Sequence, residues 1–279
     1  MENSGLSNVQ HVLDTITRKR WFLTVLFLLY FIVPSYAVRG FDPRNTAQLL
    51  IAVFSNAPLY AYPGMFPIFK IIMILFVIAI IFLGDKMTRS FHIYAGIMIL
   101  TSAWLQNMAD TPDYGFAIIT GNVVVFTLVA LLWFWEAFVR KSDFSPQKLP
   151  LWRYWVVPMA FLSFWEPASL SGHVPTADFN PLLLLTSDGA VTFCMVVPVY
   201  LAILSLFYPR VNRTVLCVTS FAGAVTGLLN MVTWFVFMPE GWWMGILHIP
   251  LLSISLYAFV LSLRKQDSHP SSHSMHTTG

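Results

Sequence analysis

Residues 164–195 read FWEPASLSGHVPTADFNPLLLLTSDGAVTFCM. This stretch has no lysine or arginine, yet it contains the titratable residues Glu166, His173, Asp178 and Asp188. Apolar segments of membrane length lie before and after it, so these side chains are expected together at one membrane surface. The other segments of the chain are assigned relative to this membrane surface.

The composition excludes a soluble protein. Of the 279 residues, 57% are hydrophobic and only 10% are charged, whereas a soluble domain carries about 25% charged residues. Lipid is therefore the expected solvent, and backbone groups in lipid must be satisfied within regular structure. The sequence predicts an all-α, polytopic membrane protein.

Eight apolar segments are predicted to cross the membrane. They cover residues 21–38, 65–83, 90–108, 115–139, 152–165, 189–208, 214–238 and 242–263. The fifth is short for a hydrocarbon core of ~30 Å and is expected to continue past Glu166. Residues 47–54 fit a helix lying at the interface better than a span. The first segment also resembles a signal peptide cleaved after Ala37, but the polytopic remainder favours an uncleaved span.

Basic residues set the predicted orientation through the positive-inside rule. With the N-terminus in the cytoplasm, 13 lysines and arginines fall on the inner side, against Arg39, Arg44 and Lys70 on the outer side. Both termini are thus predicted to be cytoplasmic, in a multi-pass protein of the plasma (inner) membrane. Residues 1–20, 142–151 and 266–279 are the expected cytoplasmic segment, linker and disordered tail.

The two membrane halves, residues 21–141 and 152–265, have loops and motifs in a similar order and at similar spacing. Phe41-Asp42-Pro43 matches Phe179-Asn180-Pro181, and a Leu-x-Asn-Met motif places Asn107 opposite Asn230. Each half crosses the membrane an even number of times, so two copies have the same orientation. These matches predict a 4+4 parallel tandem repeat.

Polar residues in the outer third of the predicted spans are the candidate ligand-binding residues, because ionisable groups in membranes are costly. They are Glu166, Asp188, Asn230, His248, Asn107 and Asn122. His173 and Asp178, with Glu166 and Asp188, form a candidate site for a metal ion, the one cofactor the sequence suggests. The alternative is structural: the carboxylates mark helix ends, and the histidine and asparagines bond between helices.

Three further structural expectations concern particular segments. Residues 166–188 are expected to fold back over the outer mouth of the bundle, with residues 181–185 against lipid or between spans. Glu136 is expected to pair with Arg140 on one helix face. Gly223 and Gly227 are expected to mark a close contact between helices.

Two classes of function remain open. A transporter or permease for a small polar or cationic solute fits the parallel repeat and the outer side, where seven acidic residues face three basic ones. A membrane-embedded enzyme with an outer-face metal or acid–base site, or an accessory subunit of a complex, fits polar groups gathered on one face. The expected partners are the lipid bilayer, a small-molecule or ion substrate, and a second copy or complex subunit, with no nucleic acid.

Overall fold

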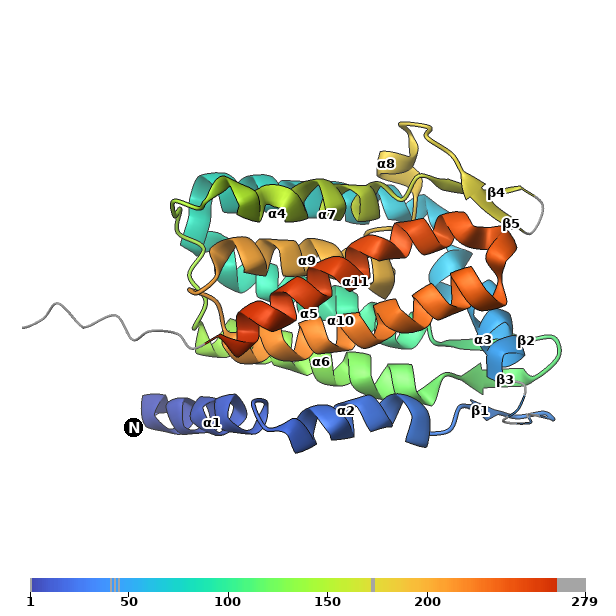
Figure 1. Cartoon of the computed structure of the whole chain (residues 1–279), viewed down its shortest axis with the longest axis horizontal. Coiled ribbons are helices and arrows are strands. Elements are labelled where there is room, and N and C mark those ends of the chain that lie inside the picture. Colours follow the sequence, from blue (N-terminus) through green and yellow to red (C-terminus); the bar gives the residue numbers. More distant parts are fainter. Residues whose placement is uncertain (1, 41, 43, 45, 172–173, 265–279) are drawn as a thin grey trace, which may run out of the picture.

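The computed structural model describes residues 2–264, apart from residues 41, 43, 45, 172 and 173. The described chain is mainly helical, and its long helices lie side by side in one bundle (Figure 1). The helices are α1 (Glu2–Ile16), α2 (Arg20–Ile32), α3 (Thr46–Ser55), α4 (Phe66–Leu83), α5 (Thr88–Leu105), α6 (Thr120–Val139), α7 (Val156–Trp165), α8 (Leu183–Thr186), α9 (Phe193–Phe207), α10 (Arg213–Val232) and α11 (Trp242–Leu263).

Four helical stretches are long and apolar enough to cross a membrane, which is consistent with a membrane protein. They are Pro63–Leu105, Thr120–Val139, Arg213–Phe237 and Pro239–Leu263. The first is 43 residues long and contains both α4 and α5, joined by a tight 3₁₀ turn at Gly84–Met87. Gly84 has a φ of 54°, and a Cβ there would lie 3.2 Å from the backbone oxygen of Phe144. A glycine thus allows the chain to reverse against the linker.

Several apolar helices are shorter than the sequence suggests. The helix of the first predicted span, α2, has 13 residues, and α9 has 15. The expectation that the fifth span continues past Glu166 is wrong. Its helix α7 ends at Trp165, because Glu166 adopts a left-handed conformation with a φ of 52° and closes the helix with a bond from its N–H to Leu162 O.

Short strands lie at the end of the bundle opposite α1, some of them beside α3 and the others beside α11 (Figure 1). They are β1 (Tyr36–Ala37), β2 (Met108–Thr111), β3 (Gly115–Ile118), β4 (Ala168–Ser171) and β5 (Val174–Ala177). The antiparallel order β1-β3-β2 pairs Tyr36 and Met108 with Ile118, and β4 pairs with β5 in a separate hairpin. The fold is thus mainly helical, as predicted, and the strands are short and confined to connections between helices.

The β2–β3 turn explains why residues 115–118 do not begin the fourth predicted span. Gly115 has a φ of 63°, and the Thr111 hydroxyl donates to Gly115 O while it accepts from Tyr114 N. This local turn holds the two strands together. The helix α6 starts only at Thr120.

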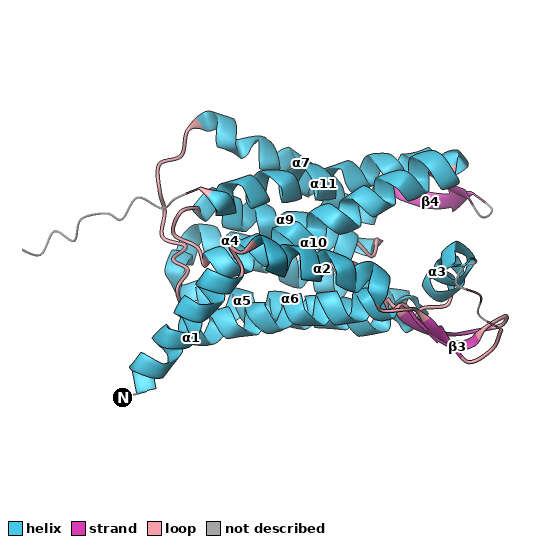
Figure 2. Cartoon of the chain, turned by 60° about the horizontal axis from the view of Figure 1, so that its bottom comes forward, coloured by secondary structure: helices cyan, strands magenta, loops and turns pink. Residues whose placement is uncertain are grey.

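The centre of the bundle is α9, which Figure 2 shows among other helices and which packs against α7, α10 and α11. Every residue from Met195 to Ser205 is buried. A helix that is buried over consecutive residues has no exposed face, and α9 accordingly lacks a charged side chain.

The close contact predicted from Gly223 and Gly227 is confirmed, and it joins α10 to α11. A Cβ at Gly223 would lie 2.3 Å from Ser255 Oγ, and one at Gly227 would lie 3.0 Å from the Leu252 backbone. The small residues allow the backbones of α10 and α11 to approach each other closely.

Candidate functional site

Lys70 is the one charged residue in α4, and it is fully buried. Its ammonium donates to the backbone oxygen of Phe164 and lies 4.2 Å from the centre of the Phe164 ring. The Lys70 side chain is therefore enclosed by the bundle and not exposed at its surface. A buried ammonium among apolar side chains is costly unless other groups compensate it.

Glu166 approaches Lys70 from the end of α7. Its left-handed backbone turns the chain at this point, and the residue is only 7% exposed. The carboxylate oxygen Oε2 is buried without a hydrogen-bond partner in residues 2–264 as the structure describes them. An unpartnered buried carboxylate oxygen is rare, because its desolvation is not repaid by a hydrogen bond.

The segment before α9 completes the cluster. The short helix α8 packs against α4 and α7, and the Ser187 hydroxyl donates to Trp165 O at 2.9 Å. A Cβ at Gly189 would lie 2.8 Å from Phe164 O, 3.0 Å from Lys70 Nζ and 3.1 Å from Glu166 Oε2. The glycine therefore lets this segment reach the lysine and the carboxylate together.

The three charged residues Lys70, Glu166 and Asp188 will be called the outer cluster, after the side on which the sequence predicts them to lie. Asp188 is half-buried, and it interacts electrostatically with both Lys70 and Glu166. The ion pairs of the described chain do not include Lys70. The outer cluster thus contains two carboxylates and one ammonium, and neither carboxylate is committed to a direct pair with the lysine.

Uncharged polar side chains extend the outer cluster toward α5. Tyr60 interacts electrostatically with Asp188 and Glu166, and the Gln106 amide donates to the Tyr60 hydroxyl at 3.5 Å. The Gln106 carbonyl accepts from Ser102 Oγ at 2.7 Å and from Phe193 N at 3.2 Å. These bonds fix Gln106 between α5 and the first residue of α9.

The predicted asparagines occupy two different settings. Asn230 lies inside α10 and donates to Thr226 O and to Cys194 Sγ, and Cys194 interacts electrostatically with Glu166. Asn107 follows α5 and accepts from Asn122 Nδ2 at 2.8 Å. Asn230 therefore borders the outer cluster, whereas Asn107 and Asn122 form a separate pair that links α5 to α6.

His248 belongs to a different contact set. Its Nδ1 atom lies 2.7 Å from Met244 O on the same helix, and its ring lies 6.5 Å from the Trp234 ring. No hydrogen bond of the described chain joins His248 to Glu166 or Asp188.

The four residues of the candidate metal site are not seen together. His173 lies outside the described residues, and Asp178 accepts from Asn180 N at 3.0 Å within its own turn. Among the residues that the structure describes, no group of three or more His, Cys, Asp or Glu side chains is placed to hold a metal ion. Glu166 and Asp188 instead lie beside a lysine.

Sequence reasoning missed Lys70, Tyr60, Gln106 and Gly189. One signal for Lys70 was available: it is the sole charge in the 18-residue apolar run of α4. The others carry no such signal, because only the packing of α4, α5, α7 and α8 brings them together.

A second polar network lies at the opposite end, around Glu136 of α6. The expected pair with Arg140 is wrong: Arg140 is exposed in a left-handed conformation after the helix. The Glu136 carboxylate instead accepts from Ser142 N at 2.6 Å and from the Asn212 amide. The chain after α6 therefore turns back, and the backbone N–H of Ser142 binds the carboxylate of Glu136 in the last turn of the helix.

This inner network attaches α1 to the bundle. Gln10 exchanges hydrogen bonds with Asn212, and Asp14 accepts from Lys141 Nζ and Thr214 Oγ1, both at 2.7 Å. Partial burial raises the pKa of Asp14, but the bonds from Lys141 and Thr214 outweigh it and hold this pKa below its ordinary value.

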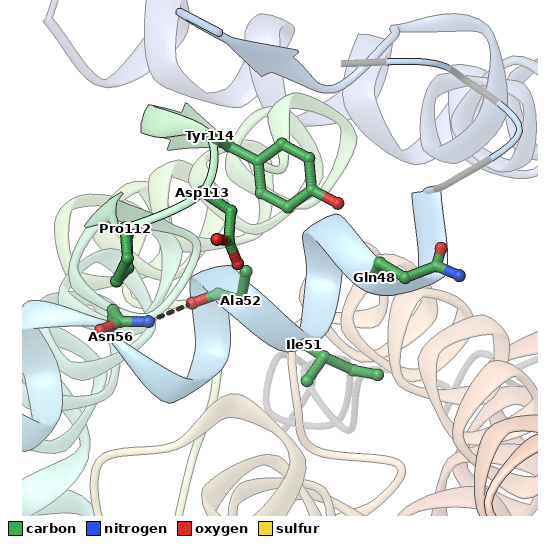
Figure 3. Close-up of a pocket in the computed structure, with 7 residues that line it drawn as sticks. All are labelled: Gln48, Ile51, Ala52, Asn56, Pro112, Asp113 and Tyr114. Atoms are coloured by element: carbon green, nitrogen blue, oxygen red, sulfur yellow. Dashed lines mark hydrogen bonds between the residues drawn. The ribbon is translucent and has the colours of Figure 1, made fainter. Parts of the chain in front are cut away.

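A groove of about 410 Å³ lies outside the bundle, between α3 and the β2–β3 hairpin. Figure 3 shows Ala52 of α3 and Asn56, which follows the helix, near Pro112 and Asp113 of the hairpin. The Asn56 amide donates to Ala52 O of α3. The groove is open and its side chains are mostly exposed, so it is a weaker candidate than the buried outer cluster.

Comparison with protein-family models, curated proteins and solved structures finds no match.

Proposed function

We propose that this chain is a multi-pass membrane transporter or permease for a small polar or cationic solute, and that the outer cluster binds the solute. The single observation that carries the proposal is the buried carboxyl group of Glu166, which lies beside Asp188 and Lys70 and whose Oε2 atom accepts no hydrogen bond from the residues that the structure describes. The two carboxylates outnumber the one ammonium. A proton or a monovalent cationic group would make the cluster neutral.

The electrostatic energy of the outer cluster favours binding of a proton or a monovalent cationic group. An opposite-charge contact near 4 Å contributes about 4 kcal/mol at an effective dielectric of ~20, before desolvation is subtracted. Lys70 neutralises one carboxylate in the absence of solute and limits the cost of burying the pair. The second carboxylate remains available for the solute. Tyr60 and Gln106 provide neutral hydrogen-bonding groups on the same side.

The proposal includes the full predicted topology. The eight crossing helices are α2, α4, α5, α6, α7, α9, α10 and α11, in the plasma (inner) membrane with both termini in the cytoplasm. Figure 1 supports it by placing α1 and the end of α11 at the same end of the bundle. The tandem repeat would match the α5–α6 pair with the α10–α11 pair, although Asn107 and Asn230 make different contacts.

Transport measurements in liposomes test the proposal. Purified protein is reconstituted with a pH-sensitive dye inside, and proton flux is followed after addition of sodium, potassium or methylammonium. We expect flux with at least one of these cations, and its loss in Glu166→Gln and in Asp188→Asn. The matched control is Glu240→Gln, which removes an exposed carboxylate and should transport normally. Equal flux in the two cluster variants and the wild type would contradict the proposal.

A further inference from the structure

His92 is a fully buried histidine near the start of α5, at the inner end of the bundle. Its ring stacks on Phe144, with centroids 5.5 Å apart and planes at 25°, and lies 5.1 Å from Trp133 with planes at 35°. Phe91 touches it edge-on at 5.9 Å. Aromatic rings thus lie against the imidazole, where a positive charge on it would be favoured by cation–π attraction.

The hydrogen bond of His92 fixes its tautomer. Nδ1 lies 2.7 Å from the carbonyl oxygen of Thr88, and a carbonyl oxygen only accepts. Nδ1 therefore carries a hydrogen, and the neutral ring has its lone pair on Nε2. The Nε2 atom is buried and has no hydrogen-bond partner within the described ranges of the chain.

The elements around His92 supply one charged group. From α6, Glu136 lies one helical turn beyond Trp133 and interacts electrostatically with His92. From α9, Tyr200 packs on Trp133 at 5.4 Å and on Phe91 at 5.6 Å, and its hydroxyl is also buried without a partner in the described chain. The linker contributes the neutral Phe144, and α10 contributes Thr219, which accepts from Trp133 Nε1.

A chain of hydrogen bonds connects Glu136 to the edge of the bundle. It runs from Glu136 through Asn212 and Gln10 to Asp14, whose partner Lys141 is exposed. The Glu136 carboxylate thus accepts hydrogen bonds from neutral donors, and no ion pair in the described part of the chain includes it.

We infer that His92 is a reversible proton-binding site in the inner half of the bundle. A proton adds to the Nε2 lone pair and leaves from the same atom, while Nδ1 keeps its bond to Thr88. Burial opposes the imidazolium charge, whereas Glu136 and the stacked rings favour it. The inference does not rest on the proposed function, because proton binding at His92 is independent of any solute at the outer cluster.

Trp133 provides a built-in reporter, because an imidazolium in contact with an excited indole quenches its fluorescence. Tryptophan emission of the full-length protein in lipid nanodiscs is measured from roughly pH 8 to pH 4, a range that covers ordinary and depressed histidine titrations. The Trp133-dependent part is the difference between the wild type and Trp133→Phe. We expect this part to fall on acidification and to recover on return to neutral pH.

Three variants test the assignment of the signal to His92. In His92→Gln the pH-dependent part should be lost, whereas in His248→Gln, the matched change at the other buried histidine, it should persist. Glu136→Gln retains His92 and should move the midpoint to lower pH by on the order of one unit, which tests the site even if His92→Gln does not fold. A Trp133 signal that is flat with pH, or one that survives in His92→Gln, overturns the inference. Neither result bears on transport through the outer cluster.

Discussion

At the scale of single residues, the outer cluster is a balance between one ammonium and two carboxylates. Lys70 reaches it from an otherwise apolar helix, and Glu166 reaches it because its left-handed backbone turns the chain at the end of α7. Removing one member of such a buried set leaves an uncompensated charge, which is more damaging than removing an exposed charge. One substitution below tests this balance of charge, and a second tests the close approach of the chain within the cluster.

Lys70→Met removes the ammonium and leaves Glu166 and Asp188 facing each other. We expect the free energy of unfolding at neutral pH to fall by about 3–5 kcal/mol, measured by thermal or denaturant unfolding in detergent. Adding Glu166→Gln should restore most of the loss, because it removes one of the two repelling charges. Arg44→Met, at an exposed arginine paired with Asp42, is the control and should not change the unfolding transition. A double variant as unstable as Lys70→Met would contradict the charge balance.

Gly189→Ala tests the close approach at the centre of the cluster. The new Cβ would lie 2.8 Å from Phe164 O, so backbone or lysine must move, at a cost of about 1–3 kcal/mol. The control is Gly64→Ala, where nothing lies within 4 Å of the added carbon. Both are compared by unfolding midpoint, and equal midpoints would show that the segment before α9 does not approach Lys70 this closely.

At the scale of elements, α1 is fastened to the bundle by polar bonds rather than by a large apolar face. Gln10 and Asp14 contact α6, α10 and the start of the linker. The Asp14 carboxylate has its pKa held below the ordinary value, so its bonds stabilise docking above the unfolded-state pKa. That contribution is lost as the pH falls through the folded-state pKa.

We therefore expect α1 to be released from the bundle in acid. Hydrogen exchange of residues 2–16 should quicken as the pH falls through the acidic range, after correction for the intrinsic pH dependence of exchange. In Asp14→Asn the exchange should already be fast at neutral pH and should lose this extra pH response. His11→Gln, an exposed change on the same helix, should behave as the wild type. Slow exchange of α1 in Asp14→Asn would show that other contacts hold the helix.

Helices that consist of long apolar runs could be predicted from the sequence. Strands could not, because they are defined by the strands with which they pair. The bounds predicted for α11 agree with the structure, and the helix predicted at residues 47–54 matches α3. Strands β2 to β5 have four residues each and no strong alternation, so only their partners define them. In the site, Glu166 and Asp188 were singled out because they are titratable. Their neighbour Lys70 was missed because sequence position alone did not show that its side chain points inward.

At the scale of the whole molecule, the strands and α3 mark one end of the bundle, and α1 with the linker marks the other (Figure 2). The proposed orientation assigns the first end to the outer side and the second to the cytoplasm. Basic residues such as Arg140 and Lys141 then face the cytoplasm, as the positive-inside rule requires.

Single cysteines labelled by a membrane-impermeant maleimide in intact cells test this orientation. Cysteines at Asp113 and Glu240 should react from outside, and cysteines at Arg89 and Arg140 should react only after the cells are opened. The native Cys194 is half-buried and Cys217 is buried, which keeps the background low. Labelling of the Arg140 position in intact cells would reverse or break the proposed topology.

The burial of α9 along residues 195–205 has a consequence for how the protein is made. A segment of 15 residues extends about 22 Å at 1.5 Å per residue, less than a hydrocarbon core of ~30 Å. Its side chains are apolar on every side, and in the finished bundle α5, α7, α10 and α11 pack against them. During synthesis α5 and α7 are already present when α9 is made, and the packing of α9 is completed by α10 and α11, which emerge from the ribosome after it. In a nascent chain that stops before residue 213, α9 should be incompletely packed, and completion of α11 should complete its packing.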